Sequence, residues 1–193
     1  MGTINLFSAI KRPFTHIQSL VLGAILIYLP VLNLFAVGYL MSCIKTHELP
    51  KWKLTMFIDG IRALIISLIY FMPALLLLSI IFVLGIPYDS IFILPFMAVL
   101  LVTMFILPAA IINYFKTKHL FQGVFASAFN SKYLLALLLG LFWAAILNLI
   151  SIALLRVLYF VFPLLLYFLI SMLISGILLF ASQISLITLL SEE

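Results

Sequence analysis

The sequence predicts an all-α, polytopic transmembrane helix bundle with four to five crossings. The chain of 193 residues is 67% hydrophobic and only 8% charged, whereas a soluble domain carries about a quarter charged residues. Its apolar stretches are continuous, as in residues 64–84, whereas the strands of a membrane β-barrel alternate apolar and polar residues. Because backbone groups inside a bilayer must be hydrogen-bonded within the protein, continuous apolar stretches predict helices.

The first predicted element is an amphipathic helix over residues 3–16. Apolar side chains recur there at spacings of three and four, at Ile4, Phe7, Ile10 and Phe14. Polar and basic side chains occupy the opposite side, so this helix is suited to lie in the membrane interface.

Residues 17–44 form an apolar segment that Pro30 and Asn33 interrupt near its middle. The segment is long enough for one tilted crossing, which needs about 20 residues, but not for two. It is either one kinked crossing or a re-entrant hairpin of two half-helices. A re-entrant turn requires that its freed backbone groups be buried in protein or face a wet cavity.

Four further apolar segments are predicted to cross the membrane, all within a single transmembrane domain that covers residues 1–193. They are residues 62–84, 91–112, 133–155 and 164–190. The basic segment 45–62 precedes them, and its Trp52, between two lysines, is predicted to anchor in the interface.

A second basic segment, residues 113–132, is predicted to contain another interfacial amphipathic helix over residues 118–130. Phe121, Phe125 and Phe129 fall on one face of such a helix. Its similarity to the N-terminal helix suggests a weak internal repeat, and such repeats are common in transporter folds.

The distribution of basic residues predicts the orientation. Segments 45–62 and 113–132 together hold seven basic residues, whereas the turn at residues 85–90 holds none. The positive-inside rule therefore places both segments and the C-terminus in the cytoplasm of a multi-pass protein of the cell (inner or plasma) membrane. A crossing at 17–44 leaves seven basic residues inside and three outside, whereas a re-entrant hairpin gives nine and one, which fits the rule better.

Charged residues near the crossings are the first candidates for functional groups. Asp59 and Arg62 lie three residues apart at the cytoplasmic end of a crossing, either as a local pair or as a polar site at the mouth of a cavity. Arg156 lies near the outer end of its crossing, where it either extends to the interface or attracts an anion.

Uncharged polar residues are the second group of candidates. Ser171, Ser175, Ser182 and Ser185 share one face of the last crossing. Such a stripe is a helix-packing surface or the lining of a substrate or ion path. Asn148 and Ser151 in the preceding crossing are placed to face it, and Asn33 marks the break in segment 17–44.

The sequence predicts neither an enzyme nor a bound cofactor. It has no spacing typical of a metal site, no phosphate-binding glycine loop and only five acidic residues. We therefore expect no catalytic, cofactor-binding or metal-binding residues. The net charge of +5 is spread over short loops, so no nucleic-acid partner is expected.

Short motifs around the first basic segment resemble a known family. These are LP-x-LNL-x-x-x-GY in residues 29–39, Leu49-Pro50-x-Trp52 and Phe57-x-Asp59-Gly60. The pattern is similar to a prokaryotic family of polytopic membrane proteins of unknown function, whose layout resembles the membrane domain attached to some glycerophosphodiester phosphodiesterases. The resemblance implies a fold and a membrane location, not an activity.

Two functions fit these observations. The first is a non-enzymatic unit that supports transport or export of a small molecule, peptide or lipid. The second is a membrane anchor or assembly subunit that binds lipid or a partner protein without a conduit. The expected partners are the lipid bilayer and either a second copy or another membrane-complex subunit.

Overall fold

The computed structural model describes residues 6–46, 49–87, 91–161 and 164–191. The described part is helical and contains no strand. Its elements are α1 (Leu6–Lys11), η1 (Arg12–Thr15), α2 (Ile17–Leu26), α3 (Asn33–Cys43), α4 (Thr55–Val83), η2 (Ile91–Ile93), α5 (Leu94–Thr117), α6 (Val124–Ala128), α7 (Ser131–Val161) and α8 (Leu164–Ser191).

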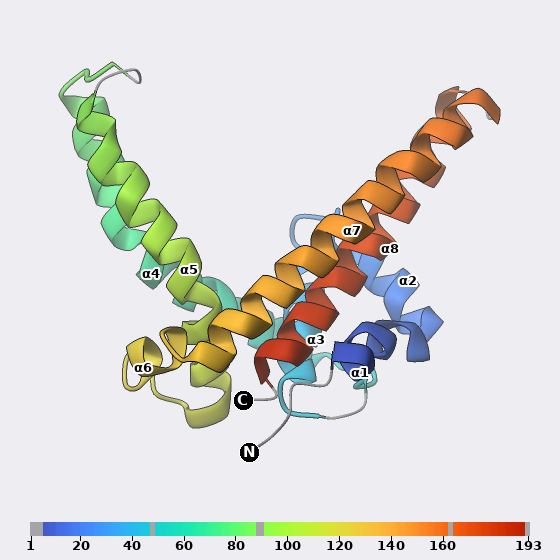
Figure 1. Ribbon diagram of the computed structural model, residues 1–193, viewed down its shortest axis with the longest axis horizontal. Helices are drawn as coiled ribbons and strands as arrows, with labels where there is room; N and C mark the ends of the chain where they lie inside the picture. The colour runs from blue at the N-terminus through green and yellow to red at the C-terminus, as the bar shows by residue number, and fades with distance from the viewer. Residues whose placement is uncertain (1–5, 47–48, 88–90, 162–163, 192–193) are drawn as a thin grey trace.

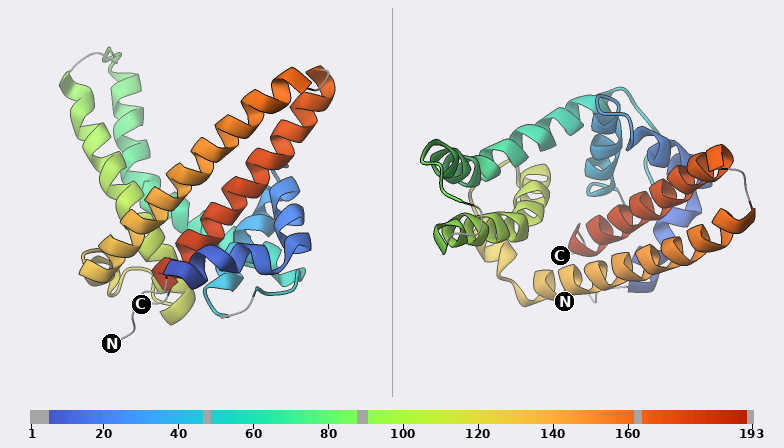
Figure 2. Two further views of the ribbon diagram at one scale, coloured as in Figure 1. Left: turned by 45° about the vertical axis from the view of Figure 1, so that its right-hand side comes forward. Right: turned by 90° about the horizontal axis from the view of Figure 1, so that it is seen from above.

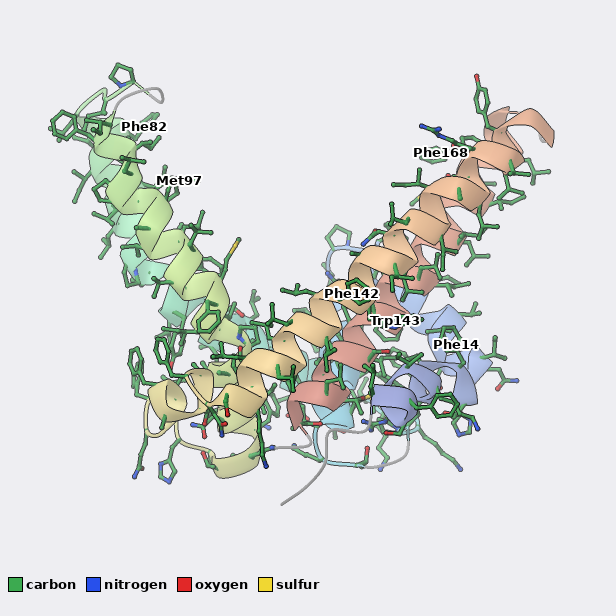
Figure 3. The ribbon with its side chains drawn as sticks, viewed as in Figure 1. Phe14, Phe82, Met97, Phe142, Trp143 and Phe168 are labelled. Carbon is green, nitrogen blue, oxygen red and sulfur yellow. The ribbon has the colours of Figure 1, made fainter. Side chains whose placement is uncertain are left out.

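The long helices form two hairpins, the α4–α5 arm and the α7–α8 arm, which diverge in a V (Figure 1). The base of the V consists of α1, η1, α2, α3 and α6 with the adjoining ends of the four long helices (Figures 1 and 2). Large apolar side chains project from both arms along their length, including Phe82 and Phe168 near the far ends (Figure 3).

Four helices in the described part are long and apolar enough to cross a membrane, namely α4, α5 with η2, α7 and α8. This confirms the predicted all-α polytopic bundle. The helices extend beyond the predicted apolar segments at the base: α4 begins at Thr55 rather than at residue 62, and α5 ends at Thr117 rather than at residue 112.

Segment 17–44 is a helical hairpin, the form that the re-entrant alternative predicts. Its two helices, α2 and α3, have 10 and 11 residues, so each rises only about 15 Å of the roughly 30 Å hydrocarbon core. Arg12, just before α2, donates hydrogen bonds to the carbonyl oxygens of Cys43 and Thr46, at and beyond the end of α3. The chain therefore enters and leaves at the same edge, as the more favourable charge tally indicated.

The hairpin packs on the rest of the molecule through glycines. A Cβ atom on Gly38 of α3 would overlap the backbone of Met56, and one on Gly60 of α4 would overlap the backbone of Leu34. The α3 and α4 backbones thus touch directly at two points. Gly23 of α2 likewise allows α8 to approach closely, because a Cβ atom at Gly23 would overlap the Phe180 ring of α8.

Trp52 packs inward, which contradicts the prediction of an interfacial anchor. Its ring stacks on Tyr39 of α3 with centroids 4.3 Å apart, and lies 6.5 Å from the Phe180 ring of α8. The Trp52 indole has an apolar body and a polar N–H group, which also suits a membrane interface. In the folded chain it packs instead against the core cluster of the base.

The predicted interfacial helices are shorter than expected. Of residues 3–16, α1 covers only Leu6–Lys11, and η1 follows because Pro13 cannot continue an α-helix; residues 3–5 lie outside the described part. In the range 118–130 only α6 is helical. Lys118 and Gly123 both have positive φ, at 67° and 76°, which interrupts helical geometry before α6.

Candidate functional site

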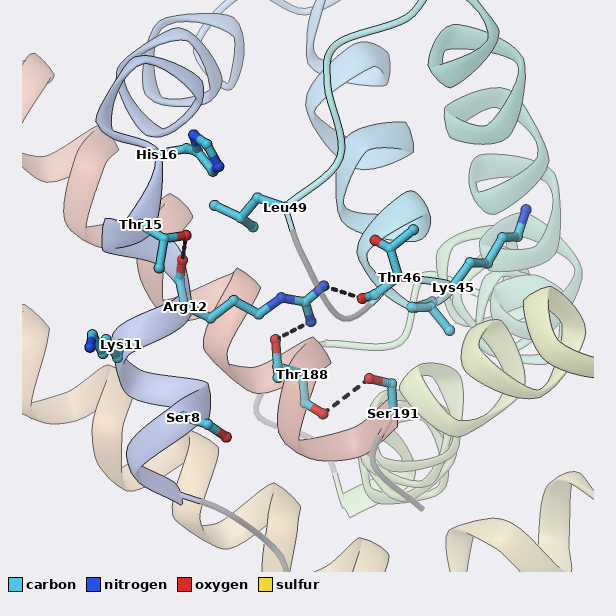
Figure 4. A pocket seen from close by; sticks show the side chains of 11 residues that line it. Ser8, Lys11, Arg12, Thr15, His16, Lys45, Thr46, Leu49, Thr188 and Ser191 are labelled. Carbon is cyan, nitrogen blue, oxygen red and sulfur yellow. Dashed lines mark hydrogen bonds between the residues drawn. The ribbon is translucent and has the colours of Figure 1, made fainter.

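The Arg12 side chain connects three elements of the base by hydrogen bonds. Its guanidinium donates to the Thr188 hydroxyl of α8 at 2.9 Å, to the Cys43 carbonyl at 3.0 Å and to the Thr46 carbonyl. Arg12 is only 9% exposed. Figure 4 shows the side chain reaching from η1 across to Thr46 and Thr188. One cation thus joins the N-terminal segment, the end of the hairpin and the end of α8.

The tip of the hairpin is an irregular segment, residues 27–32, between α2 and α3. Pro30 has no amide hydrogen, and the amides of Val31 and Leu32 form no backbone hydrogen bond with any described residue. One helix length, about 15 Å, separates the tip from the basic edge. If the hairpin inserts into a hydrocarbon layer, these free backbone groups need a protein or water partner.

A cavity of about 340 Å³ adjoins this tip. Tyr28, Asn33 and Gln183 contribute its polar groups, and the remaining lining is apolar. In the described part of the chain, these three side chains make no hydrogen bond. The structure thus brings Asn33 next to Gln183 of α8. The sequence analysis predicted Asn33 as a candidate site residue but did not predict Gln183.

A second, smaller cavity of about 200 Å³ lies between α7 and α8. Asn148, Ser151 and Ser175 line it, and the hydroxyl oxygens of the two serines are 3.4 Å apart. Asn148 and Ser151 of α7 therefore face the serine-bearing side of α8 at Ser175, as predicted. Leu179 of α8 lines both cavities, so they are neighbours along one side of this helix.

The other stripe serines are bonded to their own helix or buried. Ser171 and Ser182 donate to the carbonyls of Phe168 and Leu179, each at 2.7 Å. The buried Ser185 hydroxyl has no hydrogen-bond partner among the described residues. These positions serve helix packing, and only Ser175 reaches a cavity shared with α7.

Asp59 and Arg62 form the local pair that their spacing suggests. Arg62 Nη1 lies 2.9 Å from Asp59 Oδ1, and Lys45 Nζ lies 3.9 Å from Asp59 Oδ2. The Lys45 ammonium also lies 5.2 Å from the centre of the Phe115 ring. The cluster connects the end of α3 to α4 and α5.

Arg156 is exposed towards the far end of α7 and has no hydrogen bond or ion pair with a described residue. Metal-type ligands do not converge either: within the described ranges, no three His, Cys, Asp or Glu side chains are grouped. His47 lies outside those ranges. Burial raises the pKa of the Cys43 thiol to about 12, so this thiol stays protonated at neutral pH.

Sequence reasoning missed Arg12, Thr188 and Gln183 as parts of the site. Arg12 carried only the signal of a basic residue near a membrane end, because its partners lie 31 to 176 residues away. Gln183 carried a detectable signal, as the one amide in the apolar sequence of α8.

These features define a polytopic α-helical membrane protein with a re-entrant hairpin at its basic edge. The family described as "Protein of unknown function (DUF4013)" matches residues 21–189, and the chain belongs to it. This confirms the resemblance to an uncharacterised family seen in the sequence. No curated protein and no solved structure matches the chain significantly.

Proposed function

We propose that this protein is a non-enzymatic unit that supports transport of a small polar molecule across the cell membrane. The hairpin tip and α8 would form its polar site. The observation that carries the proposal is the cavity of about 340 Å³ beside an irregular backbone at mid-membrane depth.

Water is the partner that best satisfies this region. An unpaired polar group in hydrocarbon costs several kcal/mol, on the order of 2–7 per group. The tip has the free amides of Val31 and Leu32, and the cavity adds the polar groups of Tyr28, Asn33 and Gln183. The cavity has room for about ten waters at roughly 30 Å³ each. Broken helices with such hydrated polar groups are where many transporters bind their substrates.

The chemistry of the lining favours an uncharged solute and no catalysis. Amide and phenol groups donate and accept hydrogen bonds, but they do not titrate near neutral pH. They can therefore replace the hydration of a neutral polar molecule, but they do not supply a general acid and base pair.

We further propose that the base faces the cytoplasm. Of the ten lysine and arginine residues, all but Arg156 belong to the base or to the first turns of helices that leave it. The re-entrant hairpin places Lys11 and Arg12 on this edge as well. Such asymmetry is the pattern that the positive-inside rule associates with a cytoplasmic edge of the cell membrane.

Cysteine accessibility tests the hydrated site. In a Cys43→Ala background, Asn33→Cys and Gln183→Cys should react with a membrane-impermeant, positively charged methanethiosulfonate, because thiolates form only in water. Leu68→Cys within α4 is the control, since Leu68 is 51% exposed and does not line this cavity. If the Asn33 and Gln183 variants are as unreactive as Leu68→Cys, the cavity is dry and the proposal fails.

A flux measurement tests transport itself. Proteoliposomes containing the full chain should take up glycerol, as a neutral polar probe, faster than empty vesicles in a light-scattering assay. Asn33→Leu should remove that increase, whereas Leu68→Ala should retain it. Accessible cysteines without flux of any neutral probe would instead support the alternative function.

The alternative is an assembly or anchor subunit, and one observation favours it. Phe121, Phe125 and Phe129 project from the base around α6 and are 63%, 65% and 66% exposed. Three exposed rings on one segment suit insertion into lipid or contact with a partner protein. Replacing all three with serine should release a co-purifying partner, or shift a homo-oligomer to smaller mass, if this function is correct.

A further inference from the structure

The largest cavity described in the base is distinct from the mid-membrane site. It measures about 800 Å³ and lies between α1 with η1, the chain after α3 and the end of α8. Most of its lining residues have polar side chains: they include the basic residues Lys11, Arg12 and His16 and the hydroxyl groups of Ser8, Thr15 and Ser191.

The side chains around this cavity are arranged to receive negative charge. The side chains of Lys11 and His16 form no hydrogen bond or ion pair with any described residue. Arg12 is held in the wall by Thr188 and by the chain after α3. Figure 4 shows the Arg12 guanidinium between His16 on one side and Ser8 and Ser191 on the other. A cation fixed in this way keeps its position when an anion approaches, which lowers the entropy lost on binding.

Lys45 also borders the cavity, but it contributes less to the charge there. Its ammonium lies 3.9 Å from the Asp59 carboxylate and 5.2 Å from the centre of the Phe115 ring. In Figure 4 the Lys45 side chain extends away from Arg12. The anion-attracting groups are therefore Lys11, Arg12 and His16, with hydroxyl donors beside them.

The position of the cavity indicates which anion it suits. It opens at the basic edge of the bundle, the level at which lipid phosphates meet the ends of transmembrane helices. Basic pockets between helices at this level bind phosphate head groups, and arginine with hydroxyl donors matches the tetrahedral oxygens of a phosphate. We propose that this cavity binds a phosphate-bearing anion, either as the head group of an anionic lipid or as a soluble phosphate. The inference does not depend on transport by the mid-membrane site.

Binding can be measured with the full chain in nanodiscs. In the lipid arm, native mass spectrometry counts bound phosphatidylglycerol as its fraction in phosphatidylcholine is raised. In the soluble arm, inorganic phosphate is added to protein in pure phosphatidylcholine, and the thermal midpoint is recorded. The test variant is Lys11→Gln with His16→Gln, and both positions are exposed, so folding should be retained. The matched control is Lys51→Gln with Lys53→Gln, two exposed basic residues at the same edge that do not line the cavity.

The test variant should lose about tenfold or more in affinity for one of the two probes, and the control should change less than about twofold. A loss confined to phosphatidylglycerol identifies a lipid head group as the source, and a loss for inorganic phosphate identifies a soluble anion. Equal losses in both double variants would show attraction to the whole basic edge and overturn the site. Absence of saturable binding by the unsubstituted protein in both arms would overturn it as well.

Discussion

Helices in the base of the molecule meet backbone to backbone, whereas those of the two arms are covered on one side only. Among the arm helices, 11% of the membrane-spanning stretch of α5, 17% of that of α4 and 22% of that of α7 is buried, whereas half of that of α8 is, because α1, α2 and α3 of the base pack on it. Gly38 and Gly60 bring α3 and α4 into direct contact at the base. The arms instead present large apolar side chains such as Phe82 and Phe142, which are 79% and 67% exposed.

The difference indicates which contacts hold the fold together. Apolar side chains in lipid gain no hydrophobic stabilisation from helix association, so tight packing and hydrogen bonds must provide it. The base has both, in the glycine contacts, the aromatic cluster of Tyr39, Trp52 and Phe180, and the Arg12 hydrogen bonds. We infer that the base determines stability and that the arms tolerate substitution.

The largest effect is expected at the α3–α4 contact. Gly60→Ala places a methyl group against the Leu34 backbone, which no rotamer change can relieve, so we expect a loss at or above the upper end of about 1–3 kcal/mol. Gly140→Ala on α7 is the control, since the added methyl group meets only the flexible end of Leu186. Thermal melting in detergent compares the two. Similar midpoints for both variants would contradict direct backbone contact.

The aromatic cluster should give the next effect. Trp52→Ala removes the ring that stacks on Tyr39. We expect a stability loss of about 3 kcal/mol, the lower end of the range for truncating a buried aromatic residue, because Trp52 is partly exposed. Phe14→Ala, at a ring that is 44% exposed in the base, should change stability far less. If both variants melt alike, Trp52 is an interfacial anchor after all.

Loss of the Arg12 hydrogen bonds should reduce stability less than the two substitutions above. It should also change the reactivity of the single cysteine. Arg12→Gln leaves acceptors on α3 and α8 without their donor, so we expect the free energy of unfolding to fall by about 2 kcal/mol. The single cysteine reports the change. Cys43 is 1% exposed and burial raises its pKa to about 12, so maleimide should not label it at pH 7 in the unsubstituted protein.

In the Arg12→Gln variant, opening of the hairpin should expose the buried Cys43 thiol to water and accelerate labelling. Lys51→Gln, which removes an exposed charge from the same edge, serves as the control. Unchanged labelling in Arg12→Gln would mean that the hairpin stays closed without these hydrogen bonds.

The smallest effects are expected in the arms. Leu76→Ala on α4, where the side chain is 58% exposed, should cost less than about 0.5 kcal/mol. The same substitution at the fully buried Leu189 of the base should cost about 2–5 kcal/mol. A large loss at Leu76, or a change in oligomeric mass by light scattering, would show that a protein partner rather than lipid covers the arm.

Much of the fold follows from the sequence because its signals are local. Each of the four apolar runs after the first basic segment is a helix of sufficient length to cross a membrane, and the charges mark the edge where these runs end. Pro30 and Asn33 also mark the break between α2 and α3 correctly. Of the candidate site, Asn33, Ser151 and Ser175 were predicted and do line cavities, and Asp59 and Arg62 do pair.

The sequence by itself thus determined the membrane class, the break in segment 17–44 and the basic edge, since hydropathy, helix breakers and charge depend on neighbouring residues. Only the tertiary structure decided that the broken segment returns, that Trp52 turns inward and that Asn33 meets Gln183. Each depends on groups far apart in the chain, as in the Arg12 hydrogen bond to Thr188 across 176 positions. Such contacts arise from the packing of whole helices, which no local pattern in the sequence specifies.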